Sequence, residues 1–294
     1  MRRYIYIFLF ITFSFALEKV GLTKQNIYKN SYAVIIGINR YKNLSKLDYA
    51  VNDAKSFKKL IIDKFGYSEK NITLLIDEDA SKNNIEQAIS KISINAEQKD
   101  RIIIFFSGHG ETMSLPSGGE MGYLIPFDGT KENLFFSAIP MNDLKYLAEI
   151  SNAKHMLFLI DACYGGLAAV GTKGLSPSKK SNYLEKLLNI KSRQIITAGG
   201  RNEKVIEKPE WGHSAYTMNL IRALKNDLAD NNGDGYTTAS ELGLYLSEKV
   251  TVDSENMQTP QIRRLTSHEG EFIFLGDNHS IINDKVKTEK KYFK

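Results

Sequence analysis

The chain has 294 residues, of which 42% are hydrophobic, 11% aromatic and 25% charged. These values are typical of a globular protein, and they exclude an intrinsically disordered chain and a collagen-like fibre. The formal net charge is only +5, and the Lys and Arg residues form no long basic run, so we expect no nucleic-acid partner. Cys163 is the single cysteine, which excludes an intramolecular disulfide and a cysteine-rich zinc site.

Residues 1–16 have the pattern of a secretory signal peptide. Two arginines at the start precede an almost wholly apolar run, and small residues then stand at the two positions that a signal peptidase reads. The run has about 12 residues, fewer than the ~20 that a membrane-spanning helix needs, although an uncleaved N-terminal anchor is the alternative interpretation. We therefore expect an exported protein, periplasmic or secreted, with no stable membrane span after signal cleavage.

Beyond this segment, short apolar runs rich in β-branched residues alternate with segments of helical periodicity. The apolar runs are typical of strands covered on both faces, and they lie at residues 32–38, 72–76, 102–106, 156–160, 194–198 and 272–275. Apolar residues recur at helical spacing over residues 47–61, 83–94, 140–150, 214–228 and 238–250. This alternation predicts an α/β domain over residues 30–276, with a mainly parallel sheet of about six strands flanked by helices. A polar tail, residues 277–294, follows.

Two short motifs follow the third and fourth expected strands. Residues 107–110 read Ser-Gly-His-Gly, and residues 161–166 read Asp-Ala-Cys-Tyr-Gly-Gly. Chemistry gathers at the carboxyl ends of parallel strands, so we expect His109 and Cys163 to lie at the same edge of the sheet. An imidazole beside a thiol takes its proton and returns it to a leaving amine, which makes these residues a candidate catalytic pair. An inert buried cysteine and an unrelated loop histidine are the alternative.

These motifs resemble the catalytic motifs of caspase-like cysteine peptidases, the clan that includes metacaspases and bacterial caspase-family proteins. His109 precedes Cys163 by 54 residues, close to the spacing of about 50 noted for caspases. The resemblance extends from about Tyr32 to Leu275. It implies a caspase–haemoglobinase-like fold and endopeptidase activity on proteins or peptides through a Cys–His dyad, with no cofactor required for the chemistry. It also implies an oxyanion hole made by the backbone amides of Gly110 and Cys163.

The cysteine motif departs from that of true caspases. They carry Gln two residues before the nucleophile and commonly Arg just after it, whereas this chain has Asp161 and Tyr164. An acid two residues before the cysteine is metacaspase-like, and the resemblance implies that it lines the substrate pocket with a second acid matching Asp53. Two carboxylates attract Arg or Lys and repel Asp, so we expect cleavage after basic residues. The alternative is that Asp161 caps a turn and Asp53 belongs to the first turn of a helix.

Residues 230–241 form a second motif, which matches the calcium-loop pattern of an EF-hand at every specified position. Calcium takes roughly six to eight oxygen ligands. The pattern assigns as ligands the side chains of Asp230, Asn232 and Asp234, the carbonyl of Tyr236, a direct or water-mediated contact of Thr238, and both carboxylate oxygens of Glu241. Calcium is therefore the candidate metal, and a plain polar turn between two helices is the alternative.

Two further features bear on function. His213 opens a predicted helix after a loop, so we interpret it as a capping or packing residue. Residues 165–181, rich in Gly, Ser and Lys, predict a surface loop beside the active site. The loop is a candidate for self-cleavage at Lys173, Lys179 or Lys180, the residue type that the predicted pocket accepts, although its lysines could instead serve solubility.

The sequence therefore predicts an exported, metacaspase-like cysteine endopeptidase. Two alternatives stay open: a catalytically inactive caspase-fold module for calcium binding or signalling, and a legumain- or clostripain-like peptidase on the same fold. The presence of both Cys163 and His109 favours an active enzyme over the inactive module, because a degenerate member usually loses one of the two.

Overall fold

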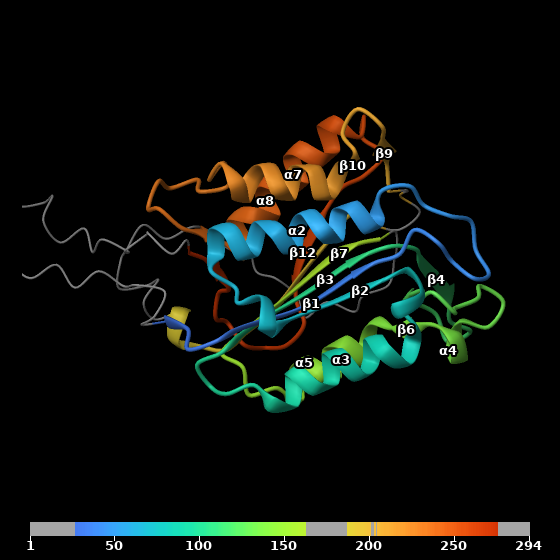
Figure 1. Ribbon diagram of the computed structural model, residues 1–294, viewed down its shortest axis with the longest axis horizontal. Helices are drawn as coiled ribbons and strands as arrows, with labels where there is room; N and C mark the ends of the chain where they lie inside the picture. Colours follow the sequence, from blue (N-terminus) through green and yellow to red (C-terminus); the bar gives the residue numbers. More distant parts are fainter. Residues whose placement is uncertain (1–26, 163–186, 201–202, 204, 276–294) are drawn as a thin grey trace, which may run out of the picture.

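A computed structural model describes residues 27–162, 187–200, 203 and 205–275. Within these residues a six-stranded central sheet forms the middle of the domain (Figure 1). Its strands lie in the order β12 (Gln261–Arg264), β8 (Ser192–Thr197), β7 (His155–Asp161), β3 (Arg101–Ser107), β1 (Ser31–Gly37) and β2 (Ile72–Ile76). All neighbouring pairs are parallel except β12 with β8. The predicted α/β fold class is confirmed.

Helices cover both faces of this sheet, as Figure 1 shows. One layer contains α2 (Ala50–Phe65), α7 (Ala215–Lys225) and α8 (Ala239–Asp253), and the other contains α3 (Lys82–Asn95) and α5 (Met141–Ile150). Side chains alternate along a strand, so each buried strand supplies both layers. In β1, Ala33 and Ile35 join the α2–α7–α8 core, whereas Val34 and Ile36 join the α3–α5 core.

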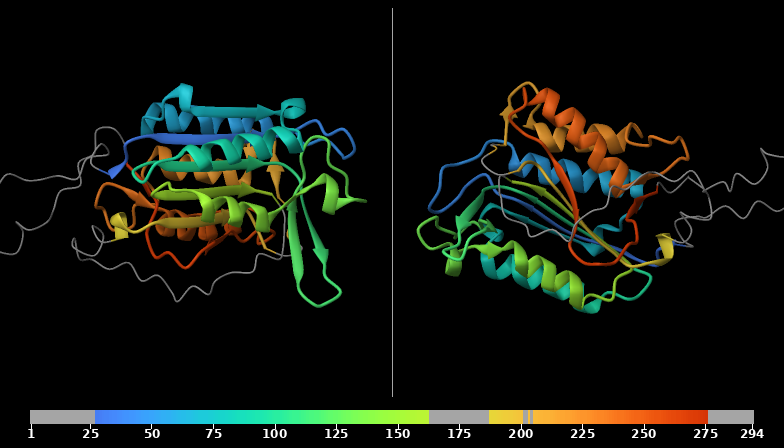
Figure 2. Two further views of the ribbon diagram at one scale, coloured as in Figure 1. Left: turned by 90° about the horizontal axis from the view of Figure 1, so that it is seen from below. Right: turned by 180° about the vertical axis from the view of Figure 1, so that it is seen from behind.

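Shorter elements complete the described residues. A hairpin of β4 (Gly110–Ser114) and β5 (Glu120–Leu124) projects beyond the sheet (Figure 2), and β5 also pairs with β6 (Ile139–Pro140). Other short elements are the hairpin β9 (Glu207–Lys208) and β10 (His213–Ser214), the helix α4 (Leu134–Ser137) and the 3-10 turns η1 (Glu69–Asn71) and η2 (Asp77–Asp79). Sequence analysis did not anticipate the hairpins, because their strands are short and carry no continuous apolar run.

The prediction for the last strand was wrong about its place. Residues 273–274 form β13 (Ile273–Phe274), which pairs antiparallel with β11 (Thr237–Thr238) in a separate two-stranded sheet. The sixth strand of the central sheet is instead β12, whose sequence Gln-Ile-Arg-Arg is only partly buried. An edge strand needs few apolar residues, and Ile262 alone packs β12 against the core, so the apolar pattern missed it.

The close packing of α2 on β1 fixes the position of the first turn of that helix. A Cβ at Gly37, the last residue of β1, would lie 2.5 Å from the carbonyl oxygen of Ala50 and 2.6 Å from the Cβ of Ala54. Glycine is therefore required for the helix to approach this closely. The contact holds the first turn of α2, which contains Asp53, against the carboxyl end of the sheet.

A buried arginine joins distant parts of the chain at the opposite end of the sheet. The side chain of Arg101 donates to the Ser31 hydroxyl at 2.8 Å, the Phe65 carbonyl at 2.9 Å and the Ile273 carbonyl at 3.3 Å. Its guanidinium also lies over the rings of Tyr28 and Tyr67, 4.8 and 4.6 Å from their centroids. These contacts supply the polar partners that a fully buried cation needs.

Several predicted features lie outside the described residues: the signal peptide at 1–16, Cys163, the loop at 165–181 and the polar tail at 277–294. Among the residues that are described, none of the helices has the length and apolar character that crossing a membrane requires.

Candidate active site

The register of two neighbouring strands builds the candidate site. Strands β3 and β7 pair in parallel with Ser107 opposite Asp161, so both end at the same edge of the sheet. His109 follows β3 by two residues, and Cys163 follows β7 by two residues and lies outside the described part of the chain. The first turn of α2 brings Asp53 to this edge, where its carboxylate accepts a hydrogen bond from the Ser107 hydroxyl at 3.3 Å.

Two groups from the loop after β1 position His109. Its Nε2 lies 2.9 Å from the carbonyl oxygen of Ser45, and because a carbonyl only accepts, Nε2 carries the proton. Its backbone N–H donates to the Tyr41 hydroxyl at 2.6 Å, and the two rings lie 4.7 Å apart. With the proton held on Nε2, Nδ1 is the nitrogen of the neutral imidazole that can accept a proton.

The surroundings of His109 favour its neutral form. Burial lowers the pKa of His109, and the positive charge of Lys131 lowers it further. The Ser45 carbonyl and the Glu111 carboxylate act in the opposite direction without reversing the shift. The imidazole is therefore uncharged near neutral pH, the form in which it can act as a general base.

Gly110, the predicted oxyanion residue, is the first residue of β4 and pairs with Leu124 of β5. A Cβ atom at the nearby Gly108 would lie only 2.4 Å from the Tyr41 hydroxyl. Any side chain at this position would therefore displace Tyr41, which holds His109 in place. The role of Gly110 toward an oxyanion stays a prediction.

Asp161 is buried at the end of β7, with 1% of its surface exposed. Its Oδ2 accepts hydrogen bonds from the Ser214 hydroxyl and, at 2.7 Å, from the Thr217 hydroxyl, both at the start of α7. Its Oδ1 is buried with no hydrogen-bond partner among the described residues. Within the described part of the chain, the Asp161 side chain therefore bonds to the start of α7 and caps no turn.

Asp53 is also fully buried, and a histidine is its nearest partner. The Nδ1 of His213 lies 2.6 Å from Oδ1 of Asp53, and the backbone N–H of Ser214 approaches Oδ2 at 3.5 Å. Ser214 thus contacts Asp53 through its backbone and Asp161 through its side chain. The structure brings together the two acids that sequence analysis assigned to substrate binding.

The two carboxyl groups carry different charges. Burial, and next the negative charge of Asp53, raise the pKa of Asp161 to about 8, against opposing hydrogen bonds from Ser214 and Thr217. Burial also raises the pKa of Asp53, but the hydrogen bond and charge of His213 oppose that shift. Asp161, whose partners are neutral hydroxyl groups, therefore holds its proton at neutral pH, whereas Asp53 has a partner for its negative charge.

The capping role considered for His213 was wrong, and its packing role takes the form of a polar contact. The N-cap of α7 is Ser214, whose hydroxyl accepts from the backbone N–H of Thr217, and the His213 side chain pairs with Asp53 instead. Sequence analysis also missed Tyr41 and Ser45. A tyrosine in a loop gives no signal, and Ser45 acts through its backbone carbonyl, which any residue would supply.

The loop at 230–241 forms a compact network of hydrogen bonds. The carboxylate of Asp230 accepts from the backbone N–H groups of Gly233, Asp234 and Gly235 at 2.8–3.2 Å. The side-chain oxygen of Asn232 accepts from the Asp234 N–H at 2.9 Å. The motif thus folds as a tight turn that its own acids hold together.

Glu241 closes this loop onto the start of α8. One of its oxygens accepts from the backbone N–H and hydroxyl of Thr238, which forms a capping box, and the other accepts from the Asn232 amide at 3.0 Å. Burial raises the pKa of Glu241 and of Asp234, and the charges of neighbouring loop acids raise both further. No group of three or more His, Cys, Asp or Glu side chains in the described residues is arranged to hold a metal ion.

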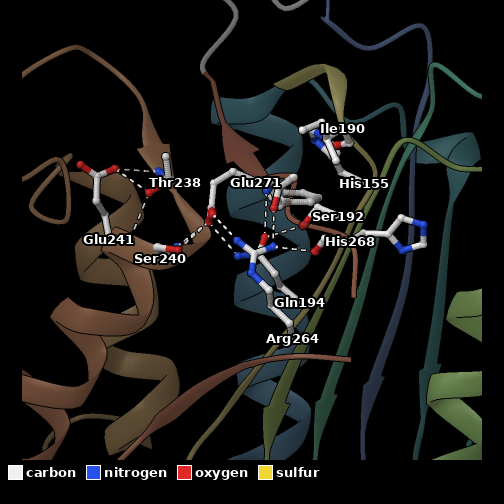
Figure 3. A network of polar contacts seen from close by, with 12 residues as sticks. His155, Ile190, Ser192, Gln194, Thr238, Ser240, Glu241, Arg264, His268 and Glu271 are labelled. Atoms are coloured by element: carbon white, nitrogen blue, oxygen red, sulfur yellow. Dashed lines mark hydrogen bonds and ion pairs between the residues drawn. The ribbon is translucent and has the colours of Figure 1, made fainter. Parts of the chain in front are cut away.

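A buried carboxylate links this loop to the central sheet (Figure 3). One oxygen of Glu271 accepts from the backbone N–H and hydroxyl of Ser240 and from the Gln194 amide of β8, all at 2.7–2.9 Å. The other oxygen accepts from Arg264 of β12 at 3.1 Å. The start of α8 and the β8–β12 edge therefore share one fully bonded acid.

Comparison with known proteins agrees with this geometry. The family model described as the caspase domain, of the peptidase family C14, matches residues 30–269. The chain belongs to the caspase family. It therefore carries a caspase-like cysteine peptidase domain, and the resemblance drawn from the two motifs is confirmed.

Relatives of this caspase domain include metacaspases. Metacaspase-1 of Eremothecium gossypii is 29% identical over 250 residues, which cover 80% of this chain and 48% of that protein. Metacaspase-7 of Arabidopsis thaliana is 31% identical over 145 residues, 46% of this chain and 34% of that protein. The chain thus spans about half or less of the length of these relatives. Caspase-1 of Spodoptera frugiperda shares the fold, with a TM-score of 0.53, 14% identity and coverage of 85% and 92% of the two chains.

The protonated Asp161 predicts a pH-dependent stability. An acid whose pKa is raised in the folded state stabilises that state fully below its unfolded pKa, and this contribution is lost as pH rises through about 8. Asp161→Asn keeps the neutral form at every pH. We expect its melting temperature to exceed that of the wild type by an amount that grows from pH 5 to pH 8. Each kcal/mol of difference in the free energy of unfolding corresponds to roughly 2–4 °C.

Differential scanning calorimetry between pH 5 and pH 9 measures this difference. The exposed Glu248→Gln on α8 is the control and should track the wild type. A difference between Asp161→Asn and wild type that is constant across this range would contradict a proton on Asp161.

Proposed function

We propose that this chain is a cysteine endopeptidase that cleaves peptide bonds after Arg or Lys. Support for the chemistry comes from His109, whose Nδ1 is held as a proton acceptor at the edge of the sheet where β7 leads into Cys163. The single observation that carries the specificity is the pair of buried acids, Asp53 and Asp161, at that same edge.

In this proposal His109 carries two protons in turn, one from the thiol and one from water. Its Nδ1 takes the proton of the Cys163 thiol, the thiolate attacks the carbonyl carbon, and the carbonyl oxygen becomes an oxyanion facing the amides of Gly110 and Cys163. As the C–N bond breaks, His109 returns the proton to the leaving amine. Water then attacks the thioester, His109 takes a proton from that water, and His109 passes this proton to the Cys163 thiolate as the C–S bond breaks.

The acid pair explains the choice of a basic side chain. An arriving guanidinium or ammonium group brings a positive charge that favours ionisation of Asp161, whose Oδ1 has no partner among the described residues. An Asp side chain would instead bring a negative charge beside the ionised Asp53 and would oppose ionisation of Asp161. The proposed substrates are therefore proteins or peptides with Arg or Lys before the cleaved bond.

A panel of fluorogenic peptides with Arg, Lys, Asn or Asp at P1 tests this proposal. We expect hydrolysis of the Arg and Lys peptides at rates at least tenfold above the others, no turnover by Cys163→Ala, and a comparable loss for His109→Ala, because the dyad acts as a unit. His268→Ala, a change of the same kind between β12 and β13, should leave activity intact. Preference for Asp, or turnover by folded Cys163→Ala, would refute the assignment.

We also propose that calcium binds the loop at 230–241 and stabilises the domain without taking part in the chemistry. Asp230, Asp234 and Glu241 offer oxygen atoms, the ligands that calcium prefers, and a cation would relieve the mutual repulsion of these acids. The hydrogen bonds that these acids now accept would compete with the ion.

Thermal unfolding with and without calcium tests this site. A ligand that binds only the folded state at 100 times its Kd stabilises it by about 2.7 kcal/mol, so millimolar calcium should raise the melting temperature by several degrees. Glu241→Gln, which can keep much of the capping box, should reduce that rise, and magnesium serves as the comparison ion. An unchanged melting temperature in calcium would leave the loop as a structural turn.

We propose finally that residues 1–16 direct export of the chain. The support is the arginine-led apolar segment with small residues at the expected cleavage positions. N-terminal sequencing of protein recovered from the periplasm or medium should begin after Ala16. Recovery of an uncut chain from the membrane fraction would favour an anchor instead.

A further inference from the structure

The hairpin of β9 and β10 holds one side chain against the acid pair. His213 is the first residue of β10 and pairs with Lys208 across this hairpin, which turns at Gly212 with a φ of +62°. The carbonyl of Gly212 accepts from the Asn52 side chain of α2 at 2.7 Å. His213 is therefore fixed over the first turn of α2 from its own hairpin, independently of the catalytic edge strands.

The imidazole of His213 covers the carboxylate of Asp53. The Asp53 side chain is 0% exposed, and the His213 side chain bonded to it is 19% exposed. The other contacts of Asp53 are made by Ser107 and Ser214, which are both buried. Among these neighbours the imidazole is thus the partly exposed partner of Asp53.

The charges around this contact favour a cation. Asp53 from α2, Asp161 from β7 and Glu207 from β9 contribute acids, while Lys208 and His213 contribute basic groups. Burial raises the pKa of Glu207, and the negative charge of Asp53 raises it further, which shows that the two acids repel each other. The N–H group of His213 is the donor that satisfies Oδ1 of Asp53 in this field.

We propose that His213 is a specificity-determining residue that occupies, in the free protein, the place on Asp53 that a substrate's guanidinium or ammonium group takes. A basic side chain must displace the imidazole before it reaches Asp53, whereas a neutral side chain gains nothing by doing so. The inference rests on the proposed function for its substrate class. The displaced contact is one charge-assisted hydrogen bond, so it weakens binding of every cation that competes for it.

Binding of agmatine, a small guanidinium compound, tests this without any turnover. In the Cys163→Ala background, His213→Ala should lower the dissociation constant of agmatine about tenfold, because one hydrogen bond to a charged group no longer has to be broken. His213→Gln keeps a neutral donor at this place and should give a smaller gain. The melting temperature shows whether His213→Ala folds. If it does not fold, His213→Gln takes its place in the test. His268→Gln is the matched control and should bind agmatine as the parent does.

Peptides with Lys or norleucine at P1 supply the second measurement, since the two side chains differ by the amino group. With Cys163 intact, His213→Ala should raise kcat/KM for the Lys peptide through KM, with kcat unchanged and the norleucine peptide unaffected. Equal or weaker agmatine binding in folded His213→Ala would overturn the inference and make His213 a positioning residue for Asp53. If the wild type hydrolyses neither peptide but His213→Ala still binds agmatine more tightly, the proposed function is overturned, and what stands is that His213 occupies a cation-binding place on Asp53.

Discussion

The burial of two carboxyl groups side by side is the constraint on which this site depends. Ionising both Asp53 and Asp161 away from water is unfavourable. Asp161 therefore keeps its proton, and Asp53 is paired with His213. The hydroxyl groups at the start of α7 support that arrangement because they can accompany Asp161 in either protonation state. The free site is thus close to neutral, and its latent negative charge develops when a cation arrives.

The fold could be predicted from the sequence wherever a strand carries a continuous apolar run. Strands β1, β2, β3, β7 and β8 all lie where such runs indicated them. The same rule failed at one edge, that of β12. Strand β12 is mostly polar because one face and one edge meet solvent, whereas the apolar segment around β13 is buried against helices without joining the central sheet. Apolar pattern reports burial, and burial alone does not identify the partner of a strand.

The candidate site was predictable for residues that chain order places at strand ends. The positions of His109 and Asp161 follow from the rule that chemistry gathers at the carboxyl edge, whereas the pairing of Asp161 with Asp53 in substrate binding came from the family resemblance. Residues that act through the backbone, such as Ser45, leave no mark in a sequence. A capping role was assigned to His213 because the residue stands just before a helix. Its partner, Asp53 on α2, lies 160 residues away in the sequence, so no local pattern indicates the contact. Long-range contacts are what the local pattern lacks.

The buried Arg101 has a consequence for how the chain is made. Its guanidinium needs the Ile273 carbonyl, 172 residues further along, and the Ile273 N–H approaches the Tyr28 hydroxyl at 3.4 Å across 245 residues. Contacts of such sequence separation close slowly, because most of the chain must be ordered first. A growing chain on the ribosome cannot complete this cluster until its last strand has been synthesised. The amino end of the sheet is therefore expected to consolidate late, after translation has passed the entire catalytic edge.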